Sequence, residues 1–218
     1  MDHSIESARF SDLRKRMVDE QLRARGITDQ RVLDAMGRVP RHEFIPEKYR
    51  EQAYEDHPLP IGEQQTISQP YIVALMLQAL EIQPKDHVLE VGTGSGYATA
   101  LLAEMAASVV SIERHHLLAE RARQLLGALG YAHIQVINSD GSRGFPEAAP
   151  YDAILVSAAA VEVPSLLVAQ LNEGGRMIIP VGPEDAQQLQ LIHIENGAPR
   201  IQLRELCRFV PLIAENRS

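Results

Sequence analysis

The chain is poor in cysteine and in aromatic residues, and it has no long apolar run. Cys207 is the single cysteine among 218 residues, so a disulfide within the chain and a secreted, disulfide-rich scaffold are excluded. Its place in an apolar run favours a core position over a nucleophile. No apolar run reaches the length of a membrane-spanning helix, and the N-terminus lacks a signal-peptide core. We therefore expect a cytoplasmic protein with no membrane partner.

Basic residues are in the minority, with 21 lysines and arginines against 29 acidic residues and a net charge of −8. This balance lacks the basic patch of a nucleic-acid-binding protein. Metal-binding patterns are missing too, because His115 and His116 are adjacent rather than four residues apart and no cysteine cluster occurs. The sequence therefore predicts neither a nucleic-acid partner nor a metal site.

Apolar runs of helical spacing alternate along the chain with short runs typical of buried strands. Helices are predicted over residues 10–22, 32–39, 70–80, 97–105, 117–129 and 165–171, and strands over 88–91, 109–112, 134–137, 153–156 and 176–181. Two further runs, 189–194 and 201–210, flank Asn196-Gly197 and predict an antiparallel hairpin. This order indicates an α/β fold: a Rossmann-like, doubly wound, mostly parallel sheet covered on both faces, with an N-terminal helical extension and a C-terminal hairpin.

The first third of the chain is expected to pack on that sheet. Gly26 should end the first helix, Thr28 or Asp29 should cap the second, and Pro40 should stop it. Residues 41–69 contain three prolines and lose their periodicity, which predicts a lid or a binding loop. We divide the chain into an extension of helices and loops, residues 1–70, and a core domain, residues 71–218, that together form one compact unit.

Three alternate glycines follow the predicted strand 88–91 and precede the predicted helix 97–105. Glycines let a ligand approach the main chain, and a helix start offers free N–H groups. The dinucleotide fingerprint needs a glycine where Tyr97 stands, so that ligand is disfavoured. The pattern Glu-x-Gly-x-Gly-x-Gly resembles that of class I S-adenosylmethionine-dependent methyltransferases. The resemblance implies that S-adenosylmethionine binds at Glu90, Gly92, Thr93, Gly94, Ser95 and Gly96.

Two acidic residues end the next two strands of the predicted sheet. In an open parallel sheet, ligands bind beyond the carboxyl ends of the strands, where the strand order reverses. Glu113 lies about twenty residues after the glycines, where a carboxylate accepts hydrogen bonds from ribose hydroxyls. Asp140, one strand further, is placed to accept from an adenine amine, although a plain Asp-Gly turn is the simpler alternative. The cofactor residues expected here are Glu113, Arg114, His115, Asp140 and Gly141.

The segment after the fourth parallel strand bears on the methyl acceptor. Methyltransferases that act on the amino groups of nucleobases resemble one another in an Asn/Asp-Pro-Pro-Tyr motif, whereas residues 157–161 read Ser-Ala-Ala-Ala-Val. Small apolar side chains cannot hold an exocyclic amine or take its proton. A carboxylate, with a pKa near 4, is ionised at neutral pH without a base and fits better as the acceptor.

Segments spread over most of the chain resemble one methyltransferase family. They read Met-Val-Asp-Glu-Gln-Leu from residue 17, Val-Pro-Arg-His-Glu-Phe from 39, Pro-Leu-Pro-Ile-Gly from 58, Gln-Thr-Ile-Ser-Gln-Pro-Tyr from 65 and Arg-Phe-Val-Pro-Leu from 208. Over residues 17–212 the chain is similar to the protein-L-isoaspartate O-methyltransferases. The resemblance implies transfer of a methyl group from S-adenosylmethionine to the free α-carboxylate of L-isoaspartyl residues in damaged proteins and peptides, which starts their repair to aspartyl.

The resemblance also implies which residues meet the acceptor. The family places a serine hydroxyl at the site, which is Ser68 here, and we interpret it as a hydrogen-bond donor that orients the carboxylate. The alternative is that Ser68 caps the helix that opens at Pro70. Thr66 is the reserve candidate. The substrate-binding residues expected in a monomeric enzyme are Thr66, Ile67, Ser68, Val210 and Pro211.

Departures from the family pattern fall in loops near the acceptor. Gln64 and Ser139 stand where glycine is common, and Ala160-Val161 replaces a proline-rich pair. Two other functions stay open: methyl transfer to a small-molecule carboxylate, and a non-catalytic module that binds S-adenosylmethionine. Asn196-Gly197 also has two interpretations, a simple hairpin turn or a succinimide-prone site that makes the enzyme its own substrate with age.

Overall fold

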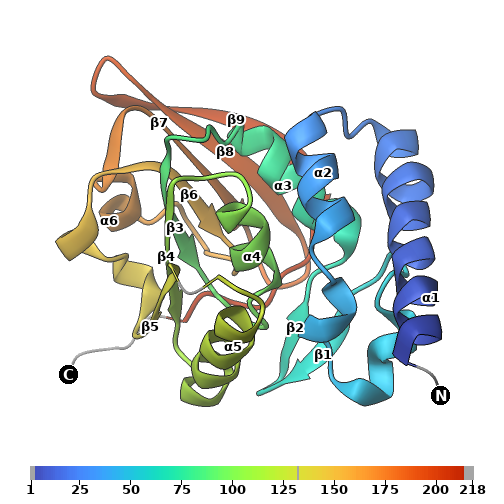
Figure 1. Ribbon diagram of the computed structural model, residues 1–218. Helices are drawn as coiled ribbons and strands as arrows, with labels where there is room; N and C mark the ends of the chain where they lie inside the picture. The colour runs from blue at the N-terminus through green and yellow to red at the C-terminus, as the bar shows by residue number, and fades with distance from the viewer. Residues whose placement is uncertain (1–2, 132, 214–218) are drawn as a thin grey trace.

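The computed structural model describes residues 3–131 and 133–213, and its centre is a seven-stranded sheet (Figure 1). The strand order is β5-β4-β3-β6-β7-β8-β9. The strands are β3 (His87–Val91), β4 (Ser108–Glu113), β5 (Gln135–Asn138), β6 (Tyr151–Val156), β7 (Leu171–Val181), β8 (Gln187–Glu195) and β9 (Ala198–Cys207). Strands β3 to β7 pair in parallel, and β8 and β9 are antiparallel, so the predicted Rossmann-like sheet with a C-terminal hairpin is confirmed.

The strand order reverses beside β3. This strand pairs with β4 on one side and with β6 on the other, so Val88 lies opposite both Val109 and Ala153. The carboxyl ends of β3, β4 and β6 therefore meet at one edge of the sheet. The loops that follow these strands diverge there, which is where an open α/β sheet binds its ligand.

Helices cover the two faces of the sheet unequally. One face packs against α3 (Pro70–Leu80), α4 (Tyr97–Ala103) and α5 (His116–Ala128), in a buried cluster shared with the N-terminal helices. The other face packs against α6 (Ser165–Val168) and nearby turns, in a cluster that includes Leu89, Ile112 and Leu167. Within the residues that the structure describes, no helix combines the length and apolar character that crossing a membrane requires.

The helix predicted over 165–171 is wrong beyond Val168, because residues 169–170 form a turn and Leu171 joins the sheet. Tyr151 pairs with Leu171, and β7 begins there, earlier than the sequence predicts. Gln170 fixes the transition, since its side-chain oxygen accepts from the Phe145 N–H at 2.8 Å. A four-residue helix has little stability of its own, so pairing with the sheet prevails.

The N-terminal extension consists of a segmented helix and a second helix. α1 (His3–Arg16) continues into a π-helical stretch (Met17–Leu22) and a 3₁₀ turn (Arg23–Arg25), and Gly26 ends it in the left-handed region. α2 (Gln30–Arg38) starts at Asp29, whose side chain accepts a hydrogen bond from the Arg31 N–H, so Asp29 rather than Thr28 is the cap. Figure 1 shows α1 and α2 together at one end of the molecule. The division at residue 70 stays a prediction.

Residues 41–69 are more regular than the sequence predicts. They contain two 3₁₀ stretches (Arg41–Phe44 and Glu47–Gln52) and an antiparallel hairpin of β1 (Leu59–Gly62) and β2 (Gln65–Ile67). The hairpin turn has φ of 50° at Glu63 and 58° at Gln64, in the left-handed region that favours glycine. Gln64, which stands where glycine is common in the family, therefore adopts a backbone conformation that glycine adopts more easily.

Candidate active site

A cavity opens at the carboxyl ends of β3, β4 and β6, where the strand order reverses. About 950 Å³ of space lies within and in front of it, part of which is open solvent. Most of the predicted site residues line it, namely Thr66, Ile67, Ser68, Gly92, Thr93, Gly94, Ser95, Glu113, Arg114, His115, Gly141, Val210 and Pro211. Glu90, Gly96 and Asp140 are not part of its wall.

The glycine loop bends over the end of β3 and is fixed from β4. The N–H groups of Gly92 and Thr93 donate to the Ile112 carbonyl at 2.8 and 3.1 Å. Gly92 has φ of 96°, and a Cβ there would lie 3.4 Å from the Cβ of Ser157. The turn therefore needs glycine, and its main chain stays open toward the cavity.

Glu113 ends β4 and fixes the loop from the side. Its Oε2 accepts from the Gly94 N–H and its Oε1 accepts from the His115 N–H, both at 2.9 Å. The residue is 5% exposed and lines the cavity. Each carboxylate oxygen has a further lone pair, so Glu113 is able to accept hydrogen bonds from ligand hydroxyls while it holds the loop.

Glu90 lies beneath the glycine loop rather than in the cavity, so direct contact with a cofactor is not supported. Its side chain is fully buried, and Oε2 accepts from the hydroxyls of Thr99 at 2.5 Å and Ser111 at 2.6 Å. The hydroxyls of Thr93 and Ser111 lie 2.5 Å apart and share a further hydrogen bond. Burial raises the pKa of Glu90 to about 7. Glu90 thus supports the loop from below.

Gly96 and Asp140 are also outside the cavity wall, although each borders a residue that lines it. Gly96 has φ of 89° and forms the turn into α4. The Oδ1 of Asp140 accepts from the Ser142 N–H at 2.9 Å and caps a short 3₁₀ turn, as the simpler alternative predicts. That turn carries Gly141 into the cavity wall, where a Cβ would lie 2.6 Å from the Val91 side chain.

Ser68 also lines the cavity, just after β2. α3 begins at Pro70 with Gln69 as its N-cap residue, whose side chain does not cap it, and Asp56 Oδ1 accepts a hydrogen bond from the Tyr71 N–H at 3.2 Å. The capping alternative for Ser68 is therefore wrong. Because the Ser68 hydroxyl is not bound to the helix start, it is available to a ligand in the cavity.

Arg41 is a buried cation behind Ser68, and sequence reasoning missed it. Its side chain is fully buried, Nε donates to the Ala53 carbonyl at 2.8 Å, and Nη2 donates to the Ser68 carbonyl at 2.9 Å. Nη1 has no hydrogen-bond partner among the described residues. Burial lowers the pKa of Arg41 to about 10, so the guanidinium is still charged at neutral pH. In the sequence, the one signal for Arg41 was its place in the family-like segment Val-Pro-Arg-His-Glu-Phe that starts at residue 39.

Tyr97 connects this arginine to the cavity. Its ring centroid lies 4.9 Å from the Arg41 Cζ, a cation–π contact, and the ring lines the cavity. The Tyr97 hydroxyl is buried without a hydrogen-bond partner in the described part of the chain, and burial raises its pKa. Sequence reasoning placed Tyr97 only at the start of a helix.

The β1–β2 hairpin packs over the glycine loop. A Cβ at Gly94 would lie 3.4 Å from the Ile61 Cδ1, and the His115 Nδ1 lies 3.8 Å from the Glu63 Oε2. The segment predicted as a binding loop is therefore an ordered hairpin at the cavity, and it carries Thr66 and Ile67 into the wall.

The C-terminal segment returns to the rim of the same cavity. The Ala159 N–H donates to the Val210 carbonyl, and the Leu212 N–H donates to the Ala159 carbonyl, both at 2.7 Å. This bridge holds Val210 and Pro211 at the wall, beside the loop after β6. The next residue, Ala160, donates its N–H to a carbonyl at 3.0 Å, a bond that a proline at this position would lose.

The cavity wall carries two chemically different sets of polar groups. The Glu113 carboxylate suits a ligand with hydroxyl donors, whereas the hydroxyls of Thr66 and Ser68, with the Arg41 charge behind them, suit an anion. Among the described residues, no group of three His, Cys, Asp or Glu side chains could hold a metal ion. Cys207 is half-buried at the end of β9 and packs against the core cluster rather than within it, and burial raises the pKa of its thiol to about 11.

Comparisons with known proteins point to one family. The family model for protein-L-isoaspartate(D-aspartate) O-methyltransferase (PCMT) matches residues 13–217. The chain is 55% identical over 203 residues to a protein-L-isoaspartate O-methyltransferase of Methanoculleus marisnigri, covering 93% of this chain and 92% of the relative. It is 56% identical over 202 residues to that of Koribacter versatilis, covering 92% and 90%.

Two solved structures share both the fold and part of the sequence. One is described as a protein-L-isoaspartate O-methyltransferase and superposes with a TM-score of 0.84 at 30% identity, covering 92% of this chain and 66% of that chain. The other, from Plasmodium falciparum, is described with the same activity and is in complex with S-adenosyl-L-homocysteine. It superposes with a TM-score of 0.81 at 30% identity, covering 92% of this chain and 98% of that chain.

Proposed function

The chain belongs to the protein-L-isoaspartate(D-aspartate) O-methyltransferase family, and on that premise we propose that it methylates the free α-carboxylate of L-isoaspartyl residues in damaged proteins and peptides. S-adenosylmethionine is the methyl donor, and esterification starts repair to aspartyl. The observation that carries this proposal is one cavity whose wall holds the Glu113 carboxylate together with Thr66 and Ser68, with the buried Arg41 cation hydrogen-bonded to the Ser68 carbonyl.

The cavity wall at the glycine loop fits the donor. When bound, S-adenosylmethionine supplies an electrophilic methyl group on a sulfonium. Glu113 accepts hydrogen bonds from the ribose hydroxyls of S-adenosylmethionine. The open main chain at Gly92 and Gly94 receives the methionine part of that molecule, and His115 flanks its adenosine. Glu90 acts indirectly, because it supports the glycine loop from below, and Asp140 caps the turn that carries Gly141 into the wall. The support for these roles is the hydrogen bonding and burial of the residues in the cavity wall.

A second group of wall residues fits the acceptor. The Ser68 hydroxyl donates a hydrogen bond to the acceptor carboxylate, and Thr66 is the second donor. Arg41 stabilises that anion from behind, since its charge is buried and it holds the Ser68 carbonyl at 2.9 Å. The backbone of Val210 and Pro211, held by Ala159, receives the peptide on either side of the isoaspartyl residue.

The reaction needs orientation more than proton transfer. An isoaspartyl carboxylate is ionised at neutral pH, so no residue has to act as a base. One carboxylate oxygen attacks the methyl carbon, the carbon–sulfur bond breaks, and the positive and negative charges of the reactants are neutralised together. A site that strips water from the carboxylate and aligns it with hydroxyl donors therefore accelerates the step.

The test is methyl transfer from labelled S-adenosylmethionine to two peptides that differ only in one isoaspartyl or aspartyl residue. We expect labelling of the isoaspartyl peptide alone. Ser68→Ala should lower kcat/KM by roughly tenfold to a hundredfold, because one hydrogen bond to a charged acceptor contributes about 1.5 to 3 kcal/mol. Its dissociation constant for S-adenosylmethionine, measured by calorimetry, should change little.

A matched control is Ser165→Ala, the same change at an exposed position at the start of α6 and outside the cavity wall. It should retain the wild-type kcat/KM. Equal labelling of both peptides would contradict isoaspartyl specificity, and labelling of small carboxylates alone would indicate a small-molecule methyltransferase. Cofactor binding without any transfer would indicate a non-catalytic module. Full activity of Ser68→Ala would overturn the role of Ser68.

The proposal includes three further expectations about the whole protein. We propose that the enzyme is a monomer, that it works in the cytoplasm, and that it needs no nucleic acid or membrane. The net charge of −8 supports the exclusion of nucleic acid. Sedimentation at several protein concentrations tests the monomer, and a concentration-dependent mass would contradict it.

A further inference from the structure

The turn between β8 and β9 is a two-residue loop made of Asn196 and Gly197. Glu195 pairs with Ala198, and the loop residues have φ of 54° and 72°. Positive φ at both positions is the type I′ geometry that Asn-Gly favours in a hairpin. Both residues are exposed, so water reaches them freely.

The same dipeptide is chemically fragile. The backbone nitrogen of Gly197 can attack the side-chain carbonyl carbon of Asn196, which expels ammonia and closes a succinimide ring. Water then opens the ring to an aspartyl or an isoaspartyl residue. The attack requires the Gly197 nitrogen to give up its proton and requires the turn to leave its type I′ geometry, because the side chain has to swing over that nitrogen.

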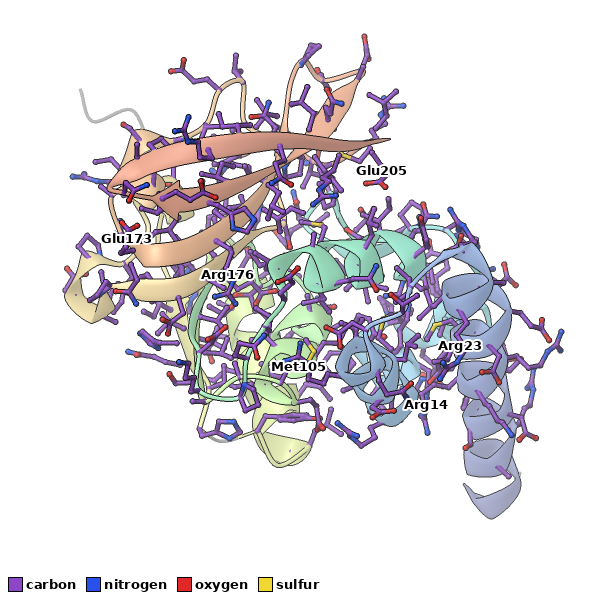
Figure 2. All side chains as sticks on the ribbon, turned by 90° about the horizontal axis from the view of Figure 1, so that it is seen from above. Arg14, Arg23, Met105, Glu173, Arg176 and Glu205 are labelled. Atoms are coloured by element: carbon purple, nitrogen blue, oxygen red, sulfur yellow. The ribbon has the colours of Figure 1, made fainter. Side chains whose placement is uncertain are left out.

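A carboxylate from another strand holds both nitrogens of this turn. Glu173, near the start of β7, accepts from the Asn196 N–H with Oε1 at 2.6 Å and from the Gly197 N–H with Oε2 at 2.9 Å. Figure 2 shows Glu173 at one end of the sheet, with Glu205 of β9 at the opposite end. The next residue, Gly174, has φ of 73°, so the chain turns sharply beside the carboxylate.

These contacts oppose both requirements of ring closure. Two charge-assisted hydrogen bonds hold the turn in its type I′ form. A negative charge next to the Gly197 N–H also disfavours loss of its proton, because a like charge would form there. We propose that Glu173 protects Asn196 from succinimide formation in the folded chain, and that Asn196 is a latent modification site that opens when this contact is lost.

The hairpin turn and the succinimide-prone site that the sequence offered as alternatives are therefore the same two residues. The turn is present, and its geometry suppresses the succinimide formation that the Asn-Gly dipeptide favours. Self-modification with age then depends on fraying or unfolding of the β8–β9 turn rather than on the dipeptide alone. An isoaspartyl residue formed there would be of the type that the proposed function methylates, but the protection itself does not depend on that activity.

The test is peptide mapping by mass spectrometry after incubation of the purified protein at pH 8 and 37 °C. Deamidation adds about 1 Da, and chromatography separates the aspartyl and isoaspartyl forms. We expect Glu173→Ala to speed the loss of Asn196 by roughly threefold to tenfold, since an exposed charge-assisted bond corresponds to about a factor of ten or less. Glu173→Gln keeps one acceptor oxygen, so its rate of Asn196 loss should lie between the rates of Glu173→Ala and the wild type.

Glu195→Gln is the matched control, because it removes a carboxylate beside the same turn, one whose ion pair is with Arg200 at 3.9 Å. It should leave the rate at Asn196 unchanged. Wild-type protein unfolded in urea should lose Asn196 faster than folded protein, which shows that the fold protects it. Equal rates in wild type and Glu173→Ala, or equal acceleration by Glu195→Gln, would overturn the proposal. The mass readout requires no methyl transfer, so an inactive enzyme would not affect it.

Discussion

Glu90 should make the stability of this protein fall as the pH rises through the neutral range. Its carboxyl group is fully buried on β3, and burial raises its pKa from 4.5 to about 7. Between these values the unfolded chain releases the proton and the folded chain keeps it. The folded state therefore binds more protons, and the free energy of unfolding falls with pH across this window. Each pH unit corresponds to 1.36 kcal/mol, so the total loss is about 3 kcal/mol.

Glu90→Gln isolates this effect. Glutamine has nearly the same shape, its oxygen can accept from Thr99 and Ser111 as Oε2 does, and it does not ionise. Its NH₂ group would take the place of Oε1, which has no partner among the described residues, and an unpaired buried donor costs about 1 to 3 kcal/mol at every pH. That cost is constant. The difference between variant and wild type should therefore shift in favour of the variant by roughly 2 to 3 kcal/mol from pH 5 to pH 8.

Urea denaturation followed by circular dichroism at several pH values between 5 and 8 measures this difference, with one slope fitted to both proteins. Glu205→Gln, at an exposed position on β9, shows how far the loss of one surface charge changes the same curves. A difference between Glu90→Gln and wild type that stays constant with pH would refute the reasoning. The affinity of Glu90→Gln for S-adenosylmethionine should differ from that of the wild type by less than about threefold, because Glu90 is not part of the cavity wall. A large loss of affinity would show that Glu90 contacts S-adenosylmethionine directly.

Three further substitutions test other parts of the structure. Glu113→Gln should weaken S-adenosylmethionine binding by roughly tenfold or more, measured by calorimetry, because an amide cannot accept at both positions; an unchanged dissociation constant would refute the ribose assignment. Arg41→Met should lower kcat more than it weakens cofactor binding, because Arg41 holds the Ser68 carbonyl. Full activity of the folded variant would refute a role for Arg41 in stabilising the methyl acceptor. Arg176→Met breaks a 2.5 Å ion pair with Asp86, whose side chain is 3% exposed, and should lower the free energy of unfolding by about 3 kcal/mol or more in urea; Arg200→Met, a surface control, should lower it far less.

The sequence predicted well wherever a structure depends on neighbouring residues. Strands, the glycine loop and the cap at Asp29 follow from local periodicity and turn chemistry, and the β8–β9 hairpin follows from its Asn-Gly turn. Prediction failed where distant segments compete for the same residues. Leu171 pairs with Tyr151 in the sheet instead of continuing α6, and the hairpin within residues 41–69 packs Ile61 beside Gly94 of the glycine loop.

In the candidate site, too, local motifs were predictable and long-range contacts were not. Family-like motifs named most of the cavity wall, but they could not say which motif residues reach it. Glu90 belongs to the glycine pattern and yet points into the core, because alternate residues of a strand face opposite sides of the sheet. Arg41 lies 27 positions before Ser68, so no local pattern could show that its buried charge holds that residue.

The sequence by itself determined the fold class, the family and the position of the donor site, because a strand, a glycine turn and a following carboxylate are encoded within about 25 consecutive residues. The motifs also named Thr66, Ser68 and Val210 for the acceptor, but only the tertiary structure showed that they line one cavity and that Arg41 supports it. The hairpin with Thr66, the buried Arg41 and the returning Val210 come from three separate parts of the chain. Their meeting depends on how helices, sheet and C-terminal segment pack together, and packing is a property of contacts rather than of sequence order.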